Sequence, residues 1–167
     1  MKRKWLLMMS VIFLQIGLAA CGGQQEMILK KENNTVDGTE QKKSVMKFYL
    51  LLVQTINRAD ASLNDFELTE SAPTLEMKVK ASESSAIVAE ELSKLEIPEL
   101  LKNHDSNLDA IIQQLIASYE AKAEELRKEE PSLEQANQLF QEANEALGNL
   151  FERVGLNRAS IDTEVNS

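Results

Sequence analysis

Apolar residues recur at helical spacing along the chain from about residue 42 onward. They fall three or four positions apart, which places them on one face of an α-helix. Prolines interrupt the pattern at positions 73, 98 and 131. Proline ends a helix because it lacks an N–H and clashes with the preceding turn. The pattern therefore predicts four helical stretches, at about 42–67, 73–95, 98–129 and 133–154.

Two of these stretches carry an unbroken seam in which steps of three and four residues alternate. The first seam is Val45, Tyr49, Leu52, Ile56, Ala59, Leu63 and Phe66; the last is Leu133, Ala136, Phe140, Ala143, Leu147, Leu150 and Val154. Such a repeat favours helices that cross at a small angle of about 20°. With short connections, the fold class is predicted to be all-α, a four-helix antiparallel bundle over residues 42–156. Residues 157–167 are mostly polar, and we expect a frayed tail, with Leu156 and Ile161 touching the end of the bundle.

Local signals also mark where these helices begin and end. Ser71 is a candidate cap for the second helix, with Pro73 in its first turn. Ser132 and Gln135 have the spacing of a capping box in front of the fourth helix. Gly155 follows that helix, where glycine commonly ends one.

The N-terminus has the pattern of an export signal. Met1 to Lys4 is basic, and the 14 residues from Trp5 to Leu18 are predominantly apolar. As a helix this run is about 21 Å long, at about 1.5 Å per residue, whereas a bilayer core is about 30 Å thick. The run is therefore short for a membrane span and typical of a signal peptide, which we assign to residues 1–20.

The four residues Leu18-Ala19-Ala20-Cys21 resemble the lipobox of bacterial lipoprotein precursors. The resemblance implies that the Cys21 thiol receives a diacylglyceryl group and that a peptidase cuts between Ala20 and Cys21. Cys21 is the only cysteine in the sequence, and a lone thiol in an exported protein is unusual unless it is modified. An uncleaved anchor and an ordinary secretory signal with an unmodified thiol are the alternatives.

This resemblance also implies a location. Two acyl chains hold a protein stably at a membrane, so the mature chain is expected on the extracytoplasmic face of the cell membrane. The short basic start and the small size are similar to those of small helical lipoproteins of Bacillus-like bacteria. Residues 21–41 are polar without sustained periodicity, and we interpret them as the lipidated N-terminus and a flexible linker of about 25 Å.

The net charge of the chain limits the classes of partner that we expect. The formal charge of −9 becomes −12 without the three basic residues of the signal peptide, and the remaining 147 residues are enough for one domain. Nucleic-acid binding requires basic patches, so an acidic chain argues against that class.

The sequence has few residues that could carry chemistry. His104 is the single histidine, whereas zinc-hydrolase motifs need two, and a di-iron Glu-x-x-His motif is missing because position 101 is leucine. Adjacent glutamates such as Glu90 and Glu91 diverge by about 100° on a helix and are poor chelators. We therefore expect no catalytic residue, metal site or cofactor, and interpret His104 as a packing or capping residue.

The start of the first helix is apolar almost all round. Met46, Leu50 and Val53 form a second stripe beside the main seam. One interpretation is that this half of the helix is buried among three neighbours. The other is an exposed patch that docks a partner protein or the bilayer surface.

These observations lead to two functional hypotheses. The first is a membrane-anchored, non-catalytic accessory module that binds another membrane or surface protein. The alternative is a carrier of a small ligand or metal, with its site inside the helical bundle and His104 as the first candidate ligand. An enzyme is disfavoured because the motifs that carry common chemistries are missing.

Overall fold

The computed structural model describes residues 23–102 and 107–165, with side chains from residue 38 onward. All regular secondary structure in this part of the chain is α-helical. The helices are α1 (Gly23–Asn57), α2 (Ala61–Glu67), α3 (Leu75–Ser93), α4 (Glu99–Lys102), α5 (Asn107–Glu125), α6 (Glu134–Arg153) and α7 (Ile161–Val165). The chain divides into two compact units, residues 1–35 and 36–167. The described part of the first unit is the beginning of α1, and the second unit is the bundle.

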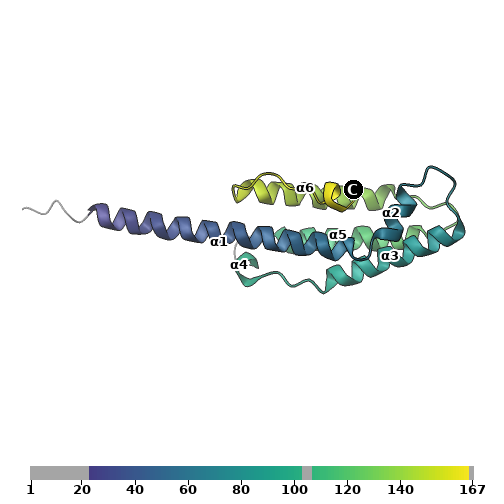
Figure 1. The fold of residues 1–167 in the computed structure, drawn as a ribbon, viewed down its shortest axis with the longest axis horizontal. Coiled ribbons are helices and arrows are strands. Elements are labelled where there is room, and N and C mark those ends of the chain that lie inside the picture. The colour runs from purple at the N-terminus through teal and green to yellow at the C-terminus, as the bar shows by residue number, and fades with distance from the viewer. Residues whose placement is uncertain (1–22, 103–106, 166–167) are drawn as a thin grey trace, which may run out of the picture. The chain divides into compact units, whose positions relative to one another are not determined.

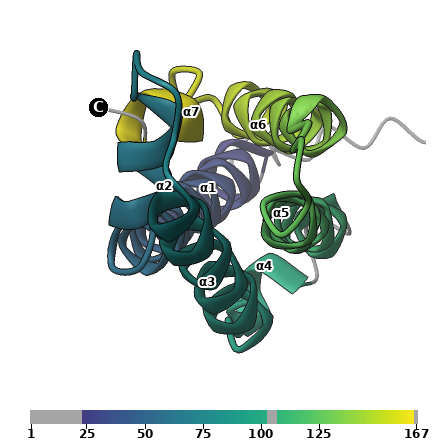
Figure 2. The same ribbon diagram turned by 90° about the vertical axis from the view of Figure 1, so that its right-hand side faces the viewer.

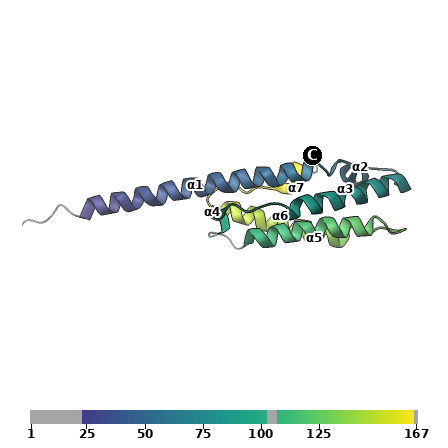
Figure 3. The ribbon, with the colours of Figure 1, turned by 90° about the horizontal axis from the view of Figure 1, so that it is seen from below.

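The predicted fold class is confirmed: the second unit is a helical bundle. Its four long helices alternate in direction along the chain, so that α3 and α6 run opposite to α1 and α5 (Figures 1 and 3). The end-on view shows these helices around a common core, with α7 beside α2 (Figure 2). Of the three short helices, α2 and α4 lie within the first and third predicted stretches, so each of these stretches contains two helices, and α7 lies in the predicted tail.

The predicted seams meet in the core of this bundle. Most seam residues are buried, and Leu52, Ile56, Leu115, Ala143 and Leu147 have no exposed surface. The interior is mainly aliphatic, with some buried polar side chains and two edge-to-face aromatic pairs, Tyr49 with Phe151 and Tyr119 with Phe140. Each such pair adds about 0.5–1.5 kcal/mol beyond the burial of its area. The 3.5-residue repeat therefore predicts correctly which faces pack together.

The first predicted helix is interrupted, which corrects the expectation of one helix over 42–67. α1 ends at Asn57, a turn follows in which the N–H groups of Ala59 and Asp60 both donate to the carbonyl of Ile56, and α2 begins at Ala61. Ser84 of α3 donates its hydroxyl to the Ala59 carbonyl. This bond satisfies a carbonyl freed by the helix end. The apolar seam continues across the turn, so periodicity alone did not reveal it.

The predicted caps also differ from those observed. α3 is capped by Thr74, whose hydroxyl accepts from the N–H of Met77 at 3.2 Å, rather than by Ser71. At the start of α6 the capping box of Ser132 and Gln135 is wrong: Leu133 occupies the cap position and makes no side-chain cap bond.

Both ends of the described chain are more helical than expected. α1 begins at Gly23, so the segment interpreted as a linker is helix up to residue 41 and beyond. Its residues include many good helix formers, and no proline interrupts them. At the other end α7 replaces the frayed tail, because Ile161 and Val165 lie one helical turn apart and are both buried. We call residues 156–165 the C-terminal strap.

Candidate functional site: an exposed aliphatic face of α1

The first candidate site is the outer face of α1. Leu50 is 52 % exposed, Leu51 42 % and Met46 39 %, and these three residues lie on two successive turns. We call them the α1 face. At about 100° per residue, Met46 and Leu50 lie about 40° apart and Leu51 about 100° beyond Leu50, so the three occupy an arc of about 140° on the exposed side of α1. Neighbouring exposed aliphatic side chains of this kind are typical of an interaction surface. The sequence pattern predicted Met46 and Leu50 as members of this patch and missed Leu51.

Val53, the third predicted member, does not belong to the α1 face. It is only 9 % exposed and packs in the hydrophobic core. Phe48, which lay outside the predicted seam, is buried as well. α1 thus buries a wide arc of its surface in the core. The reason is that α-helical geometry places residues 45, 48, 49, 52, 53 and 56 on one side of the helix. The helix is therefore buried at Val53 and exposed at Met46 and Leu50, and docking through the exposed part stays a prediction.

Basic residues border the α1 face. Lys47 is exposed beside Met46, and one turn earlier the ammonium of Lys43 lies 2.8 Å from Oε1 of Glu40. Lys43 lowers the pKa of Glu40, first through this hydrogen bond and then through its charge. Both partners of the pair are more than half exposed, so it contributes little to stability. Lys43 and Lys47 can therefore pair with acidic groups of a partner at little cost to the stability of the bundle.

A second candidate lies inside the bundle, where α2 meets α5. The ammonium of Lys122 is 2.7 Å from Oε1 of Glu67, and the Lys122 side chain is 6 % exposed. The same nitrogen lies 5.7 Å from the ring centres of Tyr119 and Phe140. A cation over aromatic faces is stabilised most when it is desolvated. The sequence did not single out Lys122, since a lysine in the last turn of an exposed-looking helix is common.

Asp60 is the other buried ionisable residue in this region. It is 3 % exposed, and among the described residues its Oδ2 has no hydrogen-bond partner. Burial raises the pKa of Asp60, a hydrogen bond from Asn64 and the charge of Lys122 oppose the rise, and the charge of Glu67 adds to it. A carboxyl in this position can hold a proton, but its burial leaves a substrate no access in this conformation.

A shallow groove between α3 and α5 is the third candidate. It is lined by Ala86, Ala89, Glu90, Ser93, Glu120, Ala123, Glu124 and Arg127. Its two ends differ in environment, because Arg127 donates to the Ser82 hydroxyl whereas Glu90 is paired with Lys94 at 2.7 Å. The groove is open to solvent and its polar groups are already partly satisfied. It lacks the enclosed walls of a typical small-ligand site.

Several predicted residues fall outside the described part of the chain. These are His104 and the lipobox residues Ala20 and Cys21. Within the described residues, no group of three or more histidine, cysteine or acidic side chains converges as a metal site would. Nor is any of the described helices sufficiently long and apolar to cross a bilayer.

The described structure places the protein in a broad class, the helical bundles, and adds one distinguishing feature, an exposed aliphatic helix face. Comparison with protein-family models yields no match for the chain, and comparison with curated proteins and with solved structures yields none either. The surfaces of the bundle are therefore the basis for any functional proposal.

Proposed function

We propose that this protein is a membrane-anchored, extracytoplasmic accessory module that binds another membrane or surface protein through the α1 face. The observation that carries the proposal is the exposure of Leu50, Leu51 and Met46 on one side of a helix whose other side is fully packed. The lysines among and beside these residues favour a partner helix that presents both aliphatic residues and carboxylates to the α1 face.

The expected affinity of such a contact is modest. Burying the exposed parts of three aliphatic side chains contributes about 2–4 kcal/mol, at about 25 cal/mol per Å². Association costs at least about 4 kcal/mol in lost motion, so further contacts or a high local concentration must add to the aliphatic core. Anchoring through a diacylglyceryl group on Cys21 would supply that concentration, because both partners would share one membrane surface.

The alternative, a carrier with its site inside the bundle, is supported by Asp60 and Lys122. These are polar side chains directed into the interior, as a carrier requires, and one of them has an unsatisfied oxygen. We favour the binding module because Lys122 is already paired with Glu67 and the surrounding core is filled by aliphatic side chains.

Crosslinking and pull-down from intact cells tests the proposal. We expect a specific membrane or surface protein to be captured by the wild type and lost with Leu50→Glu plus Leu51→Glu, because two carboxylates would be desolvated in the interface. The matched control is Leu75→Glu plus Val79→Glu, which alters two exposed aliphatic residues on α3. Circular dichroism must show that both variants fold.

The outcomes separate the candidate functions. Loss of capture with the α1 variant alone supports the binding module, and Cys21→Ser should then weaken capture by about tenfold or more, since it removes the shared surface. Equal capture by all three proteins would contradict docking through the α1 face and place the contact elsewhere on the bundle, whereas the absence of any captured protein would favour the carrier.

A further inference from the structure

The C-terminal strap is attached to the bundle chiefly through its backbone. Three donors on α1 and α2 reach its carbonyl groups, and one acceptor on α6 receives its N–H. The bonds run from Tyr49 Oη to Ser160 O at 3.0 Å, from Asn57 Nδ2 to Glu164 O at 3.1 Å, from Asn64 Nδ2 to Val165 O at 2.9 Å, and from Ile161 N to Asn144 Oδ1 at 2.8 Å. Any segment with the same backbone path satisfies these groups, whatever its side chains.

Four aliphatic side chains supply the apolar part of the attachment, of which Leu156 and Ala159 are partly buried against the core. Ile161 has no exposed surface and Val165 is 3 % exposed, so both fill sockets in the core. Between them α7 presents polar residues. The bundle therefore recognises a short helical turn with aliphatic residues at positions i and i+4, which is the usual pattern of a helix bound in a groove.

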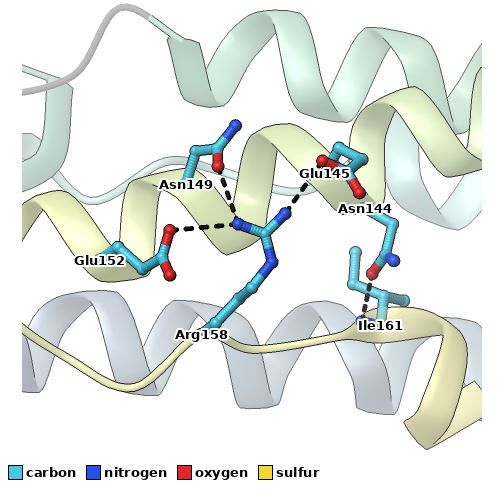
Figure 4. Close-up of polar contacts among 6 residues, drawn as sticks. All are labelled: Asn144, Glu145, Asn149, Glu152, Arg158 and Ile161. Carbon is cyan, nitrogen blue, oxygen red and sulfur yellow. Dashed lines mark hydrogen bonds and ion pairs between the residues drawn. The ribbon is translucent and has the colours of Figure 1, made fainter.

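Arg158 fastens the beginning of the strap to α6. Its guanidinium donates to Asn149 Oδ1 at 2.8 Å, to Glu152 Oε2 at 3.1 Å and to Glu145 Oε2 at 3.0 Å, as Figure 4 shows. The ion-paired side chains are 40–71 % exposed, so water competes for them and the latch is weak.

Gly148 makes room for this latch. A Cβ at Gly148 would lie 2.8 Å from Cζ and Nε of Arg158, so the guanidinium rests on the bare backbone of α6. Glycine in the middle of a helix is otherwise unfavourable. Replacing Gly148 with alanine should therefore stabilise α6 and at the same time displace the Arg158 side chain from it. The substitution thus separates the stability of the bundle from the attachment of the strap.

The strap lies next to the α1 face. A pocket of about 510 Å³ beside the strap is lined by Met46 of the α1 face, by Tyr49 and Phe151, and by strap residues. The Tyr49 and Phe151 rings stand edge to face at 5.2 Å, and both are buried. If the strap detaches, these rings are uncovered beside Met46 of the α1 face.

We propose that the C-terminal strap is an internal ligand, and that the groove it occupies binds a helical segment of a partner protein with aliphatic residues four positions apart. The inference rests on the proposed function, since the partner is the protein that contacts the α1 face. Binding replaces the strap, and the observed affinity is reduced by the fraction of molecules in which the strap is detached. An exchange of straps between two copies of the chain is the competing occupant.

A labelled peptide with the sequence of residues 156–165 is the probe, and the full chain is the receptor. We expect weak binding to the wild type, because the attached strap competes at a high effective concentration. A receptor with Ile161→Glu plus Val165→Glu cannot seat its own strap and should bind the peptide at least about tenfold more tightly. Gly148→Ala should speed the exchange of the Ile161 amide about fivefold, and should bind about fivefold more tightly only a peptide that lacks the arginine, since the strap peptide carries the same Arg158 side chain.

Three controls decide the result. A peptide carrying the two glutamates should not bind any receptor. Lys94→Ala removes a cation that bridges Glu90 and Glu91 on α3, much as Arg158 bridges two glutamates, and should leave peptide binding unchanged. A third peptide keeps only the isoleucine and valine in an alanine and lysine background, and should bind within about threefold of the strap peptide.

The proposal is overturned if no receptor binds the strap peptide, or if binding ignores the two aliphatic residues. It is also overturned in favour of strap exchange between copies if only the chain's own sequence binds. Gly148→Ala, tested with the alanine and lysine peptide that lacks the arginine, covers the case in which the double glutamate receptor fails to fold. Peptide binding is measured without a cellular partner, so its failure and the failure of capture through Leu50 and Leu51 are distinct results.

Discussion

At the scale of single residues, burial of ionisable groups is the least expected property of this molecule. Asp60 sits where α2 begins, a position at which aspartate usually accepts from the helix N–H groups, yet it makes no such cap bond. Lys122 ends up between two rings because α5 and α6 bring Tyr119 and Phe140 together. Neither environment could be predicted from the sequence, because both depend on side chains contributed by other helices.

The environment of Asp60 predicts a pH dependence of stability. Its folded pKa lies above 3.8, so its contribution to stability is fully present below that value and is lost as the pH rises through the folded pKa. Relative to Asp60→Asn, the free energy of unfolding of the wild type should therefore fall between about pH 4 and neutral pH. Urea titrations of both proteins across this range measure the difference.

Comparing the wild type with Asp60→Asn also cancels the contributions of the other ionisable groups to the pH dependence of stability. Glu67 and the ammonium of Lys122 face the same region and are present in both proteins. A difference between wild type and Asp60→Asn that stays constant from about pH 3 to about pH 7 would mean that Asp60 has an ordinary pKa in the folded state.

At the scale of elements, apolar periodicity predicted the helices and their buried faces but not how wide each buried arc is. α1 carries two apolar stripes, and the sequence treats Leu50 and Val53 alike. The structure separates them, since Leu50 is 52 % exposed and Val53 9 %. That distinction depends on where neighbouring helices lie, as do the break after Asn57 and the seating of α7. The sequence therefore predicted Met46 and Leu50 of the candidate docking site, but it missed Leu51 and wrongly included Val53.

A pair of matched substitutions tests this assignment. Leu50→Glu should change the free energy of unfolding by no more than about 0.5 kcal/mol, because the new carboxylate stays in water. Val53→Glu should cost about 3 kcal/mol or more, because it places a carboxylate in the core without a partner. Thermal and urea denaturation measure both values. Similar losses for the two variants would place Leu50 in the core and remove the α1 face.

At the scale of the whole molecule, the four-stretch pattern was sufficient for an all-helical antiparallel bundle, since short connections leave few other ways to bury four seams. The contact of Leu156 and Ile161 with the bundle was predicted, but the helix at 161–165 was not, because the strap is held largely by hydrogen bonds to its backbone, which leave no pattern in its sequence. The lipid anchor at Cys21 stays a prediction from the lipobox. The central proposal combines these parts into an anchored module that binds a partner through the α1 face.

Site-specific photocrosslinking in intact cells tests that proposal most directly. A photoreactive amino acid is placed at position 50 or, as the control, at position 87, because Leu50 and Ile87 are 52 % and 49 % exposed. We predict one major protein adduct from position 50 that is absent from position 87. No adduct at position 50, the same adducts at both positions, or adducts to lipid alone would contradict docking of a protein on the α1 face.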